Sequence, residues 1–220
     1  MHDSIIFSLI AIVAIAVAGT FIYVGVVAQQ KRSAALADAA LRTGLTFEPK
    51  VAEERLATLG PFHLFKRGHR RIGRNLMIGK ADDEPVILLD YQYTVGGGKD
   101  SHTYQQTVAV FQGVVGLPEF TLAPEHIWHR IGNLFGYQDI NFEASEEFSR
   151  HYVLRGPDES AIRSAFGAEA LGFFAQSLGW SVESCGEALA VYRTAKRIKP
   201  EEIQAFLAET AAVRRALARA

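Results

Sequence analysis

Apolar positions fill the N-terminal part of the chain without interruption, and the pattern changes only afterwards. No charged side chain occurs from Ile5 to Val27, and Lys31 and Arg32 follow within a few residues. As a helix this segment is roughly 34 Å long, which is enough to cross a hydrocarbon core of about 30 Å. The pattern predicts a single transmembrane helix within residues 1–28.

The charges on either side of this segment predict its orientation. Only Asp3 precedes it, whereas Lys31, Arg32 and Arg42 follow it against a single Asp38. Basic residues stay on the cytoplasmic side of a membrane span. We therefore expect a single-pass protein of a bacterial inner membrane with a cytoplasmic C-terminal domain; a periplasmic domain is the alternative.

A cleaved signal peptide is a second interpretation of the apolar segment. Val26 and Ala28 fit a small-residue cleavage pattern, and the mature chain would then begin at Gln29. However, the residues before the segment include no Lys or Arg, and a signal peptide has an apolar run of about 7–15 residues. Both mismatches favour a retained anchor.

Beyond the anchor, the spacing of apolar residues predicts short helices first and strands later. Helical patterns cover 28–42 and 51–59, the latter ending at Gly60-Pro61. β-branched and aromatic segments separated by turn residues predict strands at 71–79, 85–95, 102–112, 119–122, 140–142 and 152–154, and a hairpin of 180–185 with 188–193.

Three further helices are expected in the second half of the chain. Pro124-Glu125 begins one that extends to Leu134, and Pro157 precedes another that extends to Leu178 with a break at Gly167. The last begins at Pro200. The fold class is therefore α+β: a transmembrane helix followed by an antiparallel sheet with packed helices.

The expected organisation has three parts. These are an anchor at 1–28, a juxtamembrane helix and connector at 29–60, and an α+β domain at 61–220, either as one unit or as two sub-lobes at about 61–136 and 137–220. The 14 Phe residues are sufficient for an apolar core. The net charge of −1 argues against a nucleic-acid partner, because such proteins are usually basic. Cys185 is the single cysteine, so no internal disulfide forms.

Two groups of short motifs stand out in the second part of the chain. The first group comprises Leu89–Tyr93, Gly98-Lys99, Thr103 and Gln106–Val108, and the second comprises Phe142-Glu143, Phe148, Tyr152–Leu154, Asp158-Glu159 and Tyr192-Arg193. Together they resemble an uncharacterised family of bacterial proteins with an N-terminal membrane anchor and a soluble α+β domain of unknown function. The similarity covers roughly residues 45–207. It implies the architecture and supplies no catalytic residues.

No motif in the chain predicts a catalytic, cofactor or metal site. Gly96–Ser101 lacks the spacing and the following helix of a phosphate-binding loop. His126 and His129 lie three residues apart without the intervening Glu of a zinc helix. A lone Cys in a strand is usually a small apolar residue. We therefore expect no catalytic residues, no cofactor and no bound metal.

Basic residues form the strongest candidate for a surface contact. Contact with anionic lipid headgroups, at about 1 kcal/mol per residue near the surface, is one interpretation; a solvated strand edge is the other. The residues considered for lipid contact are Lys31, Arg32, Lys66, Arg67, Arg70, Arg71 and Arg74.

The sequence therefore favours a non-catalytic accessory, scaffold or interaction protein at the inner face of a bacterial membrane. Its expected partners are the lipid bilayer and either a membrane protein complex or a second copy of the chain. An enzyme or small-ligand-binding protein is the alternative, and it requires a pocket where His102, His126 or Asp90 converge. An anionic-lipid sensor is the third possibility.

Overall fold

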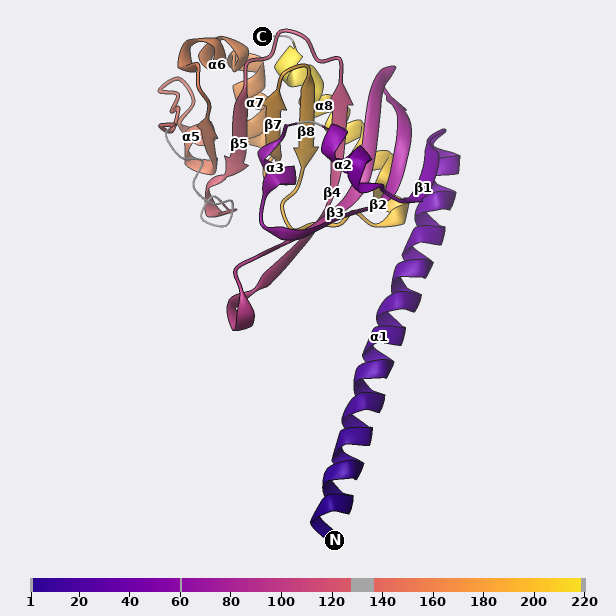
Figure 1. Cartoon of the computed structure of the whole chain (residues 1–220). Helices are drawn as coiled ribbons and strands as arrows, with labels where there is room; N and C mark the ends of the chain where they lie inside the picture. Colours follow the sequence, from indigo (N-terminus) through magenta and orange to yellow (C-terminus); the bar gives the residue numbers. More distant parts are fainter. Residues whose placement is uncertain (1, 60, 128–136, 219–220) are drawn as a thin grey trace.

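A computed structural model describes residues 2–59, 61–127 and 137–218, with the side chains of 2–6 and 8–11 outside this description. Its first element is a single long helix, α1 (His2–Arg42), which continues from the apolar segment into the folded domain. Figure 1 shows the N-terminal half of α1 extending away from every other element. The helix at Ile12–Arg42 includes an 18-residue stretch with a mean hydropathy of 2.1, none of it buried against the rest of the chain. By length and composition it is able to cross a membrane.

The domain is built on one eight-stranded antiparallel sheet with the order β1-β2-β3-β4-β8-β7-β5-β6. The strands are β1 (Thr46–Lys50), β2 (His69–Ala81), β3 (Glu84–Val95), β4 (His102–Gln112), β5 (Phe120–Pro124), β6 (Tyr152–Arg155), β7 (Ser181–Cys185) and β8 (Ala188–Tyr192). The α+β class expected from the sequence is confirmed.

Helices cover both faces of this sheet. They are α2 (Glu53–Thr58), α3 (His63–Lys66), α5 (Glu146–His151), α6 (Glu159–Ala165), α7 (Ala168–Gln176) and α8 (Ile203–Ala218), with short 3-10 turns η1 (Gly98–Asp100) and η2 (Pro200–Glu202). One core lies between the sheet and the end of α1 together with α5–α8, and a second lies between the sheet and α2–α3.

Side chains of β3 alternate between the two faces of the sheet, and both faces are covered. Leu89 and Tyr91 pack toward α3, whereas Leu88 and Asp90 point to the opposite face, toward α1. All four side chains are buried. Because the end of α1 packs on the face opposite to α3, β3 is buried on both faces.

Most expected elements are present within two residues of their predicted ends, and the differences have local causes. The predicted strand at 140–142 is extended chain without a ladder, although the Ile140 N–H donates to the Leu154 carbonyl at 2.8 Å. β1 was not expected, because Pro49 interrupts it; it is an edge strand, where proline is tolerated. In the segment where a helix is expected after Pro124, residues 125–127 are helical, and the remainder lies outside the described residues.

Candidate functional site

The helix α1 joins the domain through a buried ion pair. The Arg32 Nε and Nη2 donate to the two carboxylate oxygens of Asp90, each at 2.8 Å. The side chains of Arg32 and Asp90 are only 14% and 8% exposed. This two-pronged arrangement is the strongest hydrogen-bond geometry between these groups, and it fixes the rotation of α1 about its axis.

Neighbouring polar groups complete the coordination of Asp90. Its carboxylate also accepts from the Asn75 amide at 2.8 Å and from the Thr107 hydroxyl at 2.9 Å. Arg32 donates a third bond to the Ile198 carbonyl, and the Ile198 N–H donates to the Thr107 oxygen. The network therefore ties α1, β2, β3, β4 and the segment before η2 into one unit.

An irregularity in β2 places Asn75 in this network. The pairing of β2 with β3 shifts register between Arg74 and Met77, and Asn75 has a φ of 52°. Asparagine adopts this left-handed conformation more readily than most residues. The bulge allows Asn75 to face both Asp90 and the Ser33 hydroxyl, which donates to the Asn75 side-chain oxygen at 2.6 Å.

Further positive charge surrounds the ion pair. Arg74 and Arg197 line a hollow of about 10 Å³ together with Gln29 and Asp90. Burial lowers the pKa of Arg197 from its usual value, and the positive charges of Arg32 and Arg74 lower it further, whereas the negative charge of Asp90 opposes this change. Within the described residues, neither Arg74 nor Arg197 has an ion-pair partner. The hollow therefore has an excess of positive charge.

The structure distributes the predicted basic residues over two faces of the sheet. Lys31 is exposed on α1, Arg32 is held by Asp90, and Arg70 is exposed at the start of β2. On the face covered by α2 and α3, Arg67 donates to the Tyr93 hydroxyl at 2.9 Å and Arg71 donates to the Phe65 carbonyl at 3.1 Å. Lys66 ends α3 on that same face, while Arg74 lines the hollow beside α1. These residues therefore do not form one continuous patch.

A second polar cluster lies beneath α3. The Glu183 carboxylate accepts from the Leu64 N–H at 3.1 Å and from the Tyr192 hydroxyl at 2.9 Å. Burial raises the pKa of Glu183, although these hydrogen bonds oppose the change. Burial likewise raises the pKa of Tyr93 to about 12. Each carboxylate oxygen of Glu183 accepts one of these hydrogen bonds, so its position indicates that it anchors α3 to β7.

The adjacent hollow gives no sign of an activated nucleophile. It has a volume of about 150 Å³ and is lined by residues that include His63, Lys66, Glu183 and Cys185. Burial raises the pKa of the Cys185 thiol, and the charge of Glu119 raises it further. A raised pKa reduces the thiolate fraction, which is the reactive form.

The residues considered for a ligand pocket lie in three separate places. His102 begins β4 at the tip of its hairpin, Asp90 is enclosed beneath α1, and His126 follows β5. His129 lies outside the described residues. Among residues 2–59, 61–127 and 137–218, no three His, Cys, Asp or Glu side chains are grouped to hold a metal ion.

A further hollow lies at the end of the domain opposite to the N-terminus of α1. Its volume is about 750 Å³, and it lies between the 115–119 loop, α6 and the end of α8. Val115 is 79% exposed there. Asp158, on its rim, caps α6 by accepting from the Ala161 N–H.

Sequence reasoning did not identify the junction between Arg32 and Asp90. The two residues are 58 positions apart, and no local pattern relates them. A signal was nevertheless present: Asp90 is a charged residue within an apolar segment of β3, and a buried carboxylate requires a partner.

The comparisons with known proteins show the fold of this chain. The sequence matches no protein-family model and no curated protein. A solved structure does match: the crystal structure of the mycobacterial trehalose monomycolate transport factor A, TtfA, with a TM-score of 0.59 and 11% sequence identity. The match covers 86% of this chain and 93% of the TtfA chain. The two proteins share a fold.

Proposed function

We propose that this chain is a single-pass protein of a bacterial inner membrane and that its cytoplasmic domain is a non-catalytic accessory subunit of a membrane protein complex, one that acts in transport. Its role is to hold a docking surface at a set height and rotation beside the membrane.

The continuity of α1 is the observation that carries this proposal. The same helix that has the length and composition of a membrane span supplies Arg32 to the buried network around Asp90. An anchor that only tethered a domain would need no such junction. A buried, two-pronged ion pair with further hydrogen bonds defines one geometry, so the domain and the apolar segment behave as one body.

Two other observations support the proposal. The fold is shared with TtfA, a mycobacterial trehalose monomycolate transport factor. The positive charges of Lys31, Arg32 and Arg42, which follow the apolar segment, favour a cytoplasmic domain.

Co-purification tests the proposal directly. The full-length tagged chain would be extracted from its native membrane in mild detergent, and co-purifying proteins would be quantified by mass spectrometry. We expect at least one membrane protein in a constant ratio to the chain. The control is residues 1–28 fused to an unrelated soluble domain, which should lose this partner. A chain that purifies alone, or a control that retains the same partner in the same ratio, contradicts the proposal.

A second measurement tests the orientation. Protease added to spheroplasts should leave the domain intact and should digest it only after the membrane is permeabilised. Digestion of the domain in intact spheroplasts, or a mature chain that begins at Gln29, would overturn the cytoplasmic assignment.

A further inference from the structure

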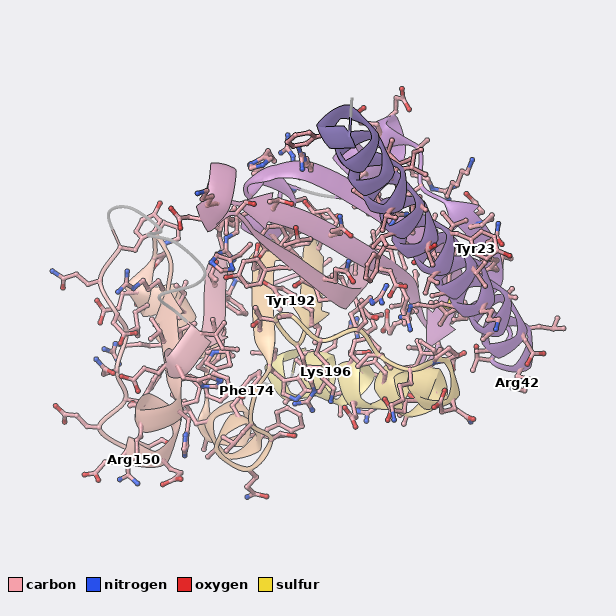
Figure 2. The ribbon with its side chains drawn as sticks, turned by 90° about the horizontal axis from the view of Figure 1, so that it is seen from below. Tyr23, Arg42, Arg150, Phe174, Tyr192 and Lys196 are labelled. Atoms are coloured by element: carbon pink, nitrogen blue, oxygen red, sulfur yellow. The ribbon has the colours of Figure 1, made fainter. Side chains whose placement is uncertain are left out.

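One end of the domain combines unpaired positive charge with proximity to the apolar part of α1. Figure 2 views the molecule from this side, and Lys196 is labelled on it. The segment from Thr194 to Lys199 connects β8 to η2, and it includes Lys196 and Arg197, which are both exposed. We define the basic face by Arg74, Lys196 and Arg197.

The charges around the hollow do not balance. Arg32, Arg74 and Arg197 contribute three guanidinium groups, and Asp90 contributes one carboxylate that Arg32 already engages. Among the described residues, Arg74 and Arg197 therefore have no hydrogen-bonded or ion-paired carboxylate, although Asp90 lies close enough to attract Arg197. Lys196 adds a third cation nearby, because its carbonyl accepts from the Thr107 N–H in the same network.

The position along α1 places this face at the depth of lipid headgroups. Gln29 lines the hollow and lies only two residues after Val27, the last residue of the uncharged segment. Arg32 is five residues after Val27, which is about 7.5 Å along a helix. The headgroup layer extends about 5–8 Å beyond the hydrocarbon core. The hollow and its guanidinium groups therefore lie in this layer when α1 spans the membrane.

We propose that the basic face is a binding site for the phosphate of anionic phospholipids in the leaflet from which α1 emerges, with Arg74 and Arg197 as the principal donors. A guanidinium group donates to phosphate through two parallel N–H bonds, and water is partly excluded at this depth. The hollow holds about one water molecule, so the phosphate lies at its opening rather than inside it. Lys196, which is exposed, contributes charge beside it. The inference shares with the proposed function only the insertion of α1 into the membrane.

Hydrogen exchange of the full-length chain in nanodiscs tests this proposal. The nanodiscs would contain phosphatidylcholine alone or with 40% phosphatidylglycerol, at low and high salt. We expect amides of 193–199 to exchange at least five-fold more slowly with phosphatidylglycerol present. This protection should be lost in 0.5 M salt, because surface electrostatic contacts are screened. Equal exchange in the two lipid compositions would overturn the proposal, whether or not protein partners co-purify.

Matched charge variants separate a specific site from general attraction. The variant R74Q/K196Q/R197Q removes the basic face, and R42Q/K80Q/R150Q removes three cations from other parts of the domain. Both should unfold at temperatures close to that of the parent chain, and only the first should lose the protection. Equal loss in both variants would show that net charge alone matters. Equal protection by millimolar glycerol phosphate in neutral nanodiscs would show a soluble-phosphate site instead of a lipid site.

Discussion

At the scale of single residues, Asp90 has the greatest influence on the junction. Its carboxylate accepts hydrogen bonds from Arg32, Asn75 and Thr107, which come from three different elements. A buried ion pair is not stabilising merely because it is buried, since desolvation offsets much of the attraction. Its effect here is to select one geometry, because any other rotation of α1 leaves buried charges unpaired.

Replacing Asp90 with alanine should therefore destabilise the domain strongly. Removing one partner leaves Arg32 as a buried, uncompensated charge, which costs about 3–5 kcal/mol. We expect a loss of this size in the free energy of unfolding, measured by urea denaturation of the detergent-solubilised chain. The control R150A breaks the exposed pair with Glu147 and should cost at most about 1 kcal/mol. A D90A chain as stable as R150A would show that the junction is not needed for the fold.

At the scale of elements, Glu183 connects α3 to the sheet. The helix α3 has only four residues and no side-chain cap, so the Glu183 carboxylate is an acceptor for its first amides. The Tyr192 hydroxyl shares the same carboxylate, and Phe65 packs edge-on to Tyr91 at 4.9 Å between ring centroids. These contacts hold a helix too short to be stable alone.

The raised pKa of Glu183 predicts a characteristic dependence of stability on pH. Between the ordinary pKa of 4.5 and the raised value, the folded chain binds more protons than the unfolded chain. Stability contributed by this group therefore falls as the pH rises through that interval, by at most about 1.4 kcal/mol per pH unit.

The variant E183Q should lack this contribution. The quantity to measure is the free energy of unfolding of the parent chain minus that of E183Q. We expect this difference to decrease as the pH increases above 4.5. Chemical denaturation at several pH values measures it, with E147Q, an exposed glutamate, as control. A difference that is constant with pH, or one that grows in favour of the parent, would refute the assignment.

At the scale of the whole molecule, the apolar part of α1 and the domain have a fixed mutual rotation. A partner that contacts both the span and the domain depends on this rotation. Inserting two alanines after Ala28 turns the span by about 200° relative to the domain, whereas four alanines turn it by about 40° because they complete one turn and little more.

Recovery of co-purifying partners should follow the rotation rather than the length. We expect the insertion of two alanines to reduce recovery several-fold and the insertion of four to restore most of it. Recovery that decreases steadily from two to four alanines would indicate that the height of the domain, and not its rotation, is what the partner detects.

Much of the architecture was predictable because the sequence patterns that indicate it are local. Neighbouring residues alone indicate the apolar segment of α1, the β-branched and aromatic segments of β3 and β4, the break at Gly167 and the helix start at Pro200. The short elements α3 and α5 and the edge strand β1 were not predictable, because contacts from distant parts of the chain stabilise them. The family resemblance likewise implied an anchored α+β domain, but it indicated no functional site.

The sequence by itself determined the anchor-like helix, the α+β class and the excess of positive charge after the apolar segment. Composition and periodicity are properties of adjacent residues, so no folding is needed to recognise them. Only the tertiary structure decided which charged side chains form ion pairs and which do not. Arg32 pairs with Asp90 across 58 positions. Arg74 and Arg197, 123 positions apart, line one hollow, and neither forms an ion pair within the part of the chain that the structure describes. Such contacts between distant residues depend on the order of the strands in the sheet and on where α1 packs against it. No local sequence pattern encodes either of these.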